Sequence, residues 1–291
     1  MIRLDAATVL LQWAVGGMAF CWFTTRRREV SLGYGWLLRA VYALLALGAA
    51  VVGIRYDPHV IRDVASIGVA VSCGVVLGVS IRRRAAGVSG HRATHDLRTA
   101  RVAAMTGIER SADAPPVVVN EAREFPPILD LVPVAIGVIG LIAAAVDAAP
   151  DAGYDTVVSL LRTLVGAAFL GSVTDAMLLG HWYLTQPGLP RRLLNELVDV
   201  LGWVWPIEVF ALLLPIGMFS VWSGSIDDGW GGMLGWFWGA CAISTIVLVF
   251  VTRAALRERE YSAVMAATGL LYLAILTAFG TDLVARAVLN G

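Results

Sequence analysis

One carboxyl group lies inside a long apolar stretch and is the strongest candidate for chemistry in this chain. Glu208 stands about midway along that stretch, between Pro206 and Pro215. Each proline removes a helical hydrogen bond and so frees a backbone carbonyl one turn earlier. A charged group at mid-bilayer costs about 2.5–3.5 kcal/mol on the insertion scale, and such groups mark proton and ion paths. The pattern predicts a proton or cation relay at Glu208, whose partner would be a freed carbonyl, a hydroxyl or water. A neutral acid hydrogen-bonded across a helix interface is the structural alternative.

A second set of polar and aromatic side chains surrounds a short loop between two apolar stretches. Because the loop over 184–192 is short, the flanking helices are expected to be antiparallel neighbours. Imidazole and phenol groups can hydrogen-bond the carbonyls of a quinone, and a carboxylate can exchange its protons. The sequence predicts a quinone-edge or proton-path pocket here, and the structural alternative is a loop with aromatic anchors and helix-start acids. The candidates are Asp175, His181, Trp182, Tyr183, Glu196 and Asp199.

Other ionisable groups in apolar stretches are expected to serve structure. Asp282 and Arg286 are four residues apart, a spacing typical of an ion pair on one helix. Arg162 is expected to reach outward or to pair with an acid at the outer border. Arg39 and Asp130 are expected at similar depth near the opposite border.

Several kinds of chemistry are excluded or disfavoured by residue usage. All 22 basic residues are arginine, so there is no retinal Schiff base, P-loop lysine or lysine nucleophile. The four histidines are not placed to ligate a haem between spans, unless a partner completes the ligand set. His91 and His95 lack further ligands nearby, so no metal site is expected. No catalytic motif is self-contained, and whether the chain is an enzyme stays open; at most it is a non-catalytic or quinone-binding subunit. No cofactor is expected within the chain, and quinone is the one candidate.

The composition determines the class of protein. Hydrophobic residues make up 58% of the chain and charged residues 15%, whereas soluble domains carry about 25% charge. We therefore expect a polytopic membrane protein, an all-α bundle of eight transmembrane helices. The stretches long enough to cross a bilayer are 6–23, 32–54, 60–81, 128–146, 156–180, 197–222, 231–251 and 262–288.

The arginines predict how the chain crosses the membrane. Sixteen of the 22 lie in loops on one side, and the opposite loops are rich in aspartate. The positive-inside rule makes the arginine-rich side cytoplasmic, with both termini on the outer side of a bacterial-type inner membrane. The chain then divides into helices one to three over 1–81, a cytoplasmic basic loop over 82–127 with an amphipathic helix near 97–108, and helices four to eight over 128–291.

Small residues at four-residue spacing predict close helix packing inside the bilayer. Gly231, Gly235 and Gly239 form one such row, and Gly74 with Gly78 forms another. Packing within the chain is expected, with a dimer interface as the alternative.

Three functions are compatible with these features. The first is an integral membrane subunit of an energy-converting or electron-transfer complex, with the quinone-edge or proton-path site at its cytoplasmic border. The alternative is a proton- or cation-coupled secondary transporter or channel centred on Glu208. The third is a membrane scaffold or assembly factor without chemistry. The expected partners are the lipid bilayer and other membrane subunits or a second copy, but not nucleic acid.

Overall fold

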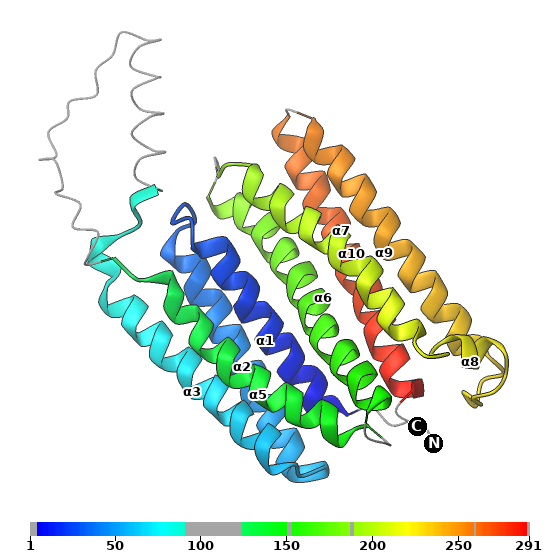
Figure 1. The fold of residues 1–291 in the computed structure, drawn as a ribbon. Coiled ribbons are helices and arrows are strands. Elements are labelled where there is room, and N and C mark those ends of the chain that lie inside the picture. Colours follow the sequence, from blue (N-terminus) through cyan, green and yellow to red (C-terminus); the bar gives the residue numbers. More distant parts are fainter. Residues whose placement is uncertain (1–4, 91–123, 150–152, 187–188, 259, 290–291) are drawn as a thin grey trace, which may run out of the picture.

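The structure, a computed structural model, describes residues 5–90, 124–149, 153–186, 189–258 and 260–289. Over these residues it is all-helical and contains eight long helices that run side by side (Figure 1). These are α1 (Ala6–Thr25), α2 (Leu32–Tyr56), α3 (Val60–Arg82), α5 (Leu131–Asp147), α6 (Tyr154–Thr185), α7 (Arg192–Leu213), α9 (Met233–Arg257) and α10 (Tyr261–Leu289). The short elements are η1 (Arg84–Ala86), η3 (Pro127–Asp130), which leads into α5, and α8 (Phe219–Trp222).

Seven of the described helices are long and apolar enough to cross a membrane, with η3 and α5 counted together. The remaining long helix is α7, which carries the three carboxyl groups of Glu196, Asp199 and Glu208 within 22 residues. The prediction of an all-helical polytopic membrane protein is confirmed, whereas the predicted count of eight spans goes one helix beyond this finding. Many apolar side chains, such as Leu44, Val71 and Leu276, are exposed on the helix faces, where a bilayer would cover them.

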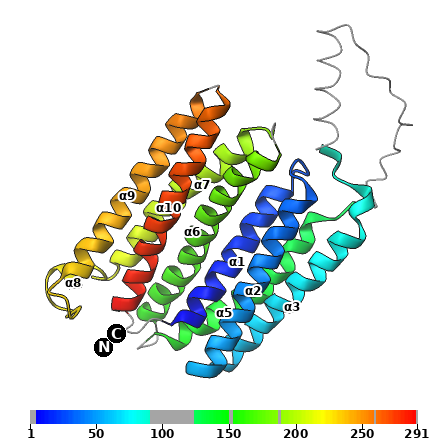
Figure 2. The ribbon, with the colours of Figure 1, turned by 180° about the vertical axis from the view of Figure 1, so that it is seen from behind.

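Helix α6 is the centre of the arrangement. It packs against α1 and α5 on one side and against α7 and α10 on the other. Helices α2 and α3 extend the first side and α9 extends the second, so the molecule is a slab divided by α6 (Figures 1 and 2). One continuous core of buried apolar side chains runs through both sides.

The two ends of the slab differ in charge. The α1–α2 connection, the end of α3, the α6–α7 connection and the α9–α10 connection lie at one end, uppermost in Figure 1. We call it the arginine-rich end, for Arg26–Arg28, Arg82–Arg84, Arg191, Arg192 and Arg257. The start of α1 and the end of α10 lie at the opposite end, called the acidic end for Asp57, Asp147, Asp155, Asp227 and Asp228.

The predicted sixth span over 197–222 is wrong at its C-terminal end. Helix α7 stops at Leu213, and Leu214 is extended, with ψ of 149°. Proline disfavours helical backbone at the residue before it and has no N–H to continue the helix, which explains this end. Helix α8 then forms a separate turn. Glu208 is consequently five residues from the end of α7 rather than midway along a span.

The start of α9 is held by one carboxylate outside the long helices. Asp228 accepts hydrogen bonds from the backbone N–H groups of Gly232 at 2.8 Å, Trp230 at 2.9 Å and Leu234 at 2.9 Å. These donors, Gly232 first among them, hold the pKa of Asp228 below its ordinary value because they stabilise the charged form.

The glycine rows do not pack as predicted. A Cβ atom at Gly74 or Gly78 would meet nothing within 4 Å, so that row faces open space. Gly235 and Gly239 face the Trp222 ring of α8 rather than another long helix. The close approach of two helices occurs instead where Gly16 of α1 meets Gly171 of α6, backbone against backbone.

The predicted amphipathic helix near 97–108, together with His91 and His95, lies outside the described residues. Of the basic loop over 82–127, the structure describes the residues up to 90 and those from 124 onward.

Candidate functional site

The residues of the predicted border pocket lie in separate surroundings. Asp175 is fully buried in α6, ten residues before the end of the helix. Its Oδ1 accepts a hydrogen bond from the Tyr42 hydroxyl of α2, and its Oδ2 has no partner among the described residues. The backbone carbonyl of Asp175 is 3.5 Å from the Tyr34 hydroxyl. Asp175 therefore joins α6 to α2 in the core rather than facing the border.

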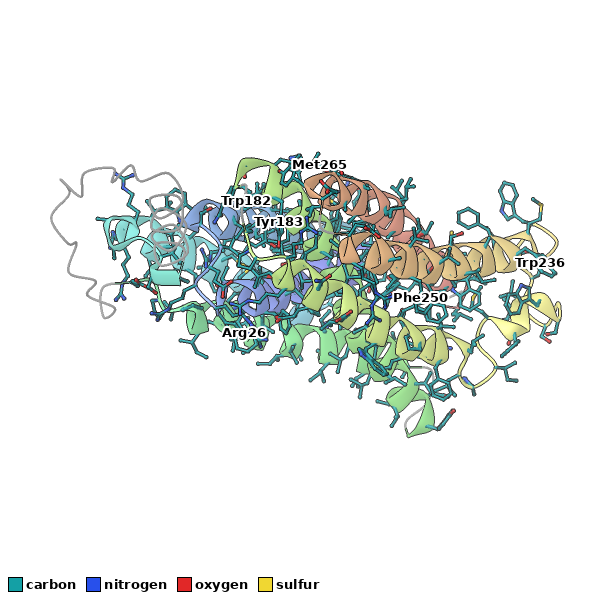
Figure 3. All side chains as sticks on the ribbon, turned by 90° about the horizontal axis from the view of Figure 1, so that it is seen from above. Arg26, Trp182, Tyr183, Trp236, Phe250 and Met265 are labelled. Atoms are coloured by element: carbon teal, nitrogen blue, oxygen red, sulfur yellow. The ribbon has the colours of Figure 1, made fainter. Side chains whose placement is uncertain are left out.

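The three residues that follow the core part of α6 point in different directions. His181 is exposed, and its Nδ1 is 3.3 Å from the Tyr272 hydroxyl of α10. Trp182 donates from Nε1 to the Ser31 hydroxyl at 3.1 Å, and Tyr183 donates to the Pro190 carbonyl at 2.7 Å. Figure 3 shows Trp182 and Tyr183 near the middle of the arginine-rich end.

The two acids of α7 have arginine partners at the surface. Glu196 lies 2.7 Å from Arg27, and Asp199 lies 2.9 Å from Arg253. All six candidates thus have their own contacts, and the described residues form no single pocket around them. The short loop does bring the ends of α6 and α7 together. It does not set the rotation of each helix about its axis, which decides where a side chain points.

A buried ion pair closes the arginine-rich end of the first four long helices. Arg39 of α2 donates to Asp130 from Nε at 2.7 Å and from Nη2 at 2.8 Å, and both side chains are buried. Ser80 and Thr25 add hydroxyl contacts at 3.4 and 3.3 Å. The bidentate geometry satisfies both charges, so this pair serves the packing of α2 against η3 and α3.

The Glu208 carboxyl is the part of the structure that differs most from ordinary packing. Glu208 is fully buried, and neither of its oxygens accepts a hydrogen bond from a donor group of the described residues. Its carboxyl lies within hydrogen-bonding reach of the Asp282 carboxyl, with which it can share a proton. The side chain faces Asp282 and Arg286 of α10 and Arg162 of α6. We call Arg162, Glu208, Asp282 and Arg286 the four-charge cluster. It joins three helices that are distant in the sequence.

Within the cluster, Asp282 and Arg286 form the predicted pair on one helix. The Nε of Arg286 lies 2.9 Å from both oxygens of Asp282. Gly166 of α6 makes room for this pair, since a Cβ there would lie 2.6 Å from Arg286 Nη2 and 2.8 Å from Asp282 Oδ1. The absence of a side chain at Gly166 therefore lets α6 lie against two charged groups.

Arg162 has an unusual set of partners. Its Nε donates to the Ala211 carbonyl at 3.2 Å and its Nη2 donates to the Leu214 carbonyl, both at the end of α7. No ion pair within 4.0 Å is found for Arg162 among the described residues, and its own carbonyl accepts from Arg286 Nη2 at 3.0 Å. Ala211 is the carbonyl that Pro215 frees, so this acceptor, one of the three kinds of partner predicted for Glu208, is used by Arg162 instead.

A cavity of about 1060 Å³ lies at the acidic end, directly over the four-charge cluster. Its lining includes Arg162, Arg286, Leu212 and Pro215. Glu208 does not line it, but Arg286 both lines the cavity and binds Asp282. The other ionisable groups in its lining are Asp5, Asp57, His59, Arg62, Asp147 and Asp155.

The depth of each charged residue within its helix indicates this cluster, although the spacing of residues along one helix does not. Measured from the acidic end, Arg162 is eight residues into α6, Asp282 is seven from the end of α10, and Glu208 is five from the end of α7. These positions have nearly equal depth, since each residue adds about 1.5 Å. Charged groups at equal depth in antiparallel helices can meet, whereas sequence spacing alone pairs only Asp282 with Arg286.

Comparison of the chain with protein-family models, curated proteins and solved structures gives no match, so the function is argued from the geometry.

Proposed function

We propose that the protein is a proton- or cation-coupled secondary transporter whose ion site is the four-charge cluster. One observation carries this proposal: the buried carboxyl pair of Glu208 and Asp282 touches, through Arg286, a large polar cavity at the acidic end. Buried ionisable groups in membrane helices are costly, and a costly group beside an access route is typical of an ion path. Transporter sites of this kind are commonly built where interrupted helices meet.

The chemistry of the cluster follows from its charges. Two neighbouring carboxyl groups away from water resist being ionised together, because each charge repels the other. With Arg286 paired to Asp282, Glu208 is the group with the free valence for a proton or a small cation. The positive charge of Arg162 nearby stabilises the Glu208 carboxylate after the ion has left, so the ion can also be released. The site thus takes one ion at a time, and changes its net charge when it does so.

We further propose that α7 is the eighth span and that both termini lie outside a bacterial-type cytoplasmic membrane. Helix α7 packs beside α6 and α9 along the slab, and the arginine asymmetry between the two ends supports a cytoplasmic arginine-rich end. In this orientation the cavity opens to the exterior, and Glu208 would receive ions from that side.

The other two hypotheses have less support. A quinone headgroup needs several donors around one pocket, and the described candidates near the arginine-rich end have separate partners. A scaffold without chemistry leaves the burial of two adjacent carboxyl groups, Glu208 and Asp282, unexplained.

Proton movement into vesicles tests the proposal. Purified protein is reconstituted into liposomes that contain a pH-sensitive dye, a mixture of amino acids, sugars and small carboxylic acids is added outside as co-substrate, and a potassium diffusion potential makes the lumen negative. We expect proton uptake above that of empty liposomes. We expect Glu208→Gln to abolish the increase, because glutamine keeps the shape of the side chain but cannot exchange a proton. Asp227→Asn, at an exposed acid of the loop before α9, is the matched control and should keep the wild-type rate.

The same assay with a sodium gradient and a sodium-sensitive dye covers the cation alternative. Wild-type vesicles that behave like empty ones with both ions would end the transporter proposal. Equal rates in wild type and Glu208→Gln would show that the ion does not pass through this site.

A further inference from the structure

We propose that the cavity at the acidic end binds a small zwitterion of the amino-acid class. Its carboxylate would lie on Arg162 and Arg286, and its ammonium group would lie toward Asp155. This inference rests on the proposed transport function and names the class of its substrate.

Arg162 is positioned for a ligand rather than for a protein acid. Two carbonyls of α7 hold its Nε and Nη2, and Nη1 has no partner among the described residues. Carbonyls orient a guanidinium but do not neutralise its charge. Arg286 lies beside it and also lines the cavity, so two guanidinium groups face the same space. Paired guanidiniums are the usual receptor for a carboxylate, which they bind in a bidentate manner.

Asp155 provides the opposite charge on the same helix. Asp155, Ser159, Arg162 and Thr163 recur at helical spacing on α6, and all four line the cavity. One face of α6 therefore carries, in order from the start of the helix, an acid, a hydroxyl, a cation and a second hydroxyl. Asp155 is half-buried and has no ion pair within 4.0 Å among the described residues.

The other acids of the lining lie near basic side chains. Arg62 lies 3.1 Å from Asp5 and 3.8 Å from Asp57. Asp147 lies 4.0 Å from the imidazole of His59, which is a cation only when it is protonated. In the described lining, Asp155 is thus the acid without a basic side chain within 4.0 Å, and Arg162 is the arginine without an acidic one.

The charges of the lining select the ligand class. Pockets for small molecules measure about 300–1,000 Å³, so a cavity of about 1060 Å³ has room for an amino acid with water but does not select one by size. A simple carboxylic acid would bring a second negative charge toward Asp155. A simple amine would bring a positive charge toward two arginines. A zwitterion satisfies both ends of the lining.

The arrangement also connects the ligand to the ion site. Asp282 binds Arg286 on its own helix and lies beside Glu208 on α7, and Arg162 lies near Glu208 and Arg286. A ligand carboxylate would compete with Asp282 for Arg286, so binding of the zwitterion would change the surroundings of the Glu208 carboxyl.

Thermal stability of the purified protein in detergent tests this inference. The probes are the twenty protein amino acids and 4-aminobutanoate, with butanoate, butylamine and phosphate as ligands of a single charge type. We expect at least one zwitterion to raise the melting temperature by about 3 °C at ten times its Kd, and to do so more than the single-charge ligands. Arg162→Gln should weaken its binding by about tenfold or more. Asp155→Asn should remove the preference for 4-aminobutanoate over butanoate.

Two matched controls keep the result specific. Arg55→Gln changes an exposed arginine at the same end that is not in the lining, and Asp227→Asn changes an exposed acid there. Both should bind like wild type.

Failure to bind any zwitterion, equal binding of butanoate, butylamine or phosphate, or unchanged binding in both Arg162→Gln and Asp155→Asn would overturn the inference. Proton or sodium uptake that persists with such a result would leave the transport function standing with a different substrate.

Discussion

At the scale of single residues, Glu208 costs stability rather than supplying it. Both of its oxygens are buried without a donor group among the described residues, and the group within hydrogen-bonding reach is another buried carboxyl, that of Asp282. An unsatisfied buried polar group costs about 1–3 kcal/mol. We therefore expect Glu208→Gln and Glu208→Leu to melt at or above the wild-type temperature in detergent, and the leucine variant to gain about 1–3 kcal/mol.

Leu201→Ala checks that this measurement detects loss of packing. Leu201 is a fully buried residue of the same helix, and its truncation should cost about 2–5 kcal/mol. A comparable loss of stability in Glu208→Leu would mean that the carboxylate is needed to neutralise Arg162, and would assign Glu208 a structural role.

The Arg39–Asp130 pair is expected to behave in the opposite way. Both side chains are almost completely buried, so Asp130→Asn leaves a cation without its counter-ion. Breaking a buried pair from one side costs about 3–5 kcal/mol. The matched control is Arg253→Gln, which breaks a pair whose side chains are 42% and 45% exposed and should cost at most about 1 kcal/mol. Thermal or chemical unfolding in detergent measures both, and equal losses would contradict the assignment of Arg39 as a structural residue.

The sequence identified Glu208 because a lone carboxyl between prolines stands out in an apolar stretch. It did not identify Arg162 as a partner, because that contact joins α6 to α7 over 49 positions and through backbone carbonyls. Asp175 was likewise placed wrongly, at the border, because the helical rotation that turns it toward Tyr42 is set by packing and not by the loop.

At the scale of helices, close approach depends on which glycines face another backbone. A Cβ at Gly171 would lie 2.7 Å from the Cα of Gly16, whereas one at Gly74 would meet nothing within 4 Å. We expect Gly171→Ala to cost about 1–3 kcal/mol through overpacking. Gly74→Ala should be neutral or add up to about 1 kcal/mol, because alanine favours the helix. Melting temperatures of the two variants decide this, and a tolerated Gly171→Ala would mean that α1 and α6 can separate.

The sequence predicts well that each long helix occurs, and it predicts less well where each helix ends. Apolar stretches of sufficient length gave the starts of α1, α2 and α3 to the residue, because loops with Asp, Pro or Ser precede them. The sixth span was drawn too long because 214–222 is as apolar as a helix. Pro215 ends α7 there, and the one-turn helix α8 follows, which hydropathy cannot distinguish from a continued span.

At the scale of the whole molecule, the functional groups gather where the two sides of the slab meet. Helix α6 belongs to both sides, and it supplies Arg162, Gly166 and Asp155 to the site. Helices α7 and α10 supply the carboxyl pair, while the lining of the cavity also includes residues from the starts of α1 and α3. A small rotation of one side against the other would change the cavity and the contacts of Arg286 together. Such rocking is the usual means of alternating access.

The orientation of the slab in a membrane leads to the last prediction. Thr185 at the end of α6 and Ser225 in the loop after α8 are exposed and lie at opposite ends of α7. The native cysteines are buried, so Thr185→Cys and Ser225→Cys can each be labelled selectively. An impermeant maleimide added to intact cells should label Ser225→Cys and not Thr185→Cys, which should react only after the membrane is opened. Labelling of both from outside would mean that α7 does not cross the bilayer. Labelling of Thr185→Cys alone would invert the orientation, and the cavity would then open to the cytoplasm, where Glu208 would exchange ions with the cell interior.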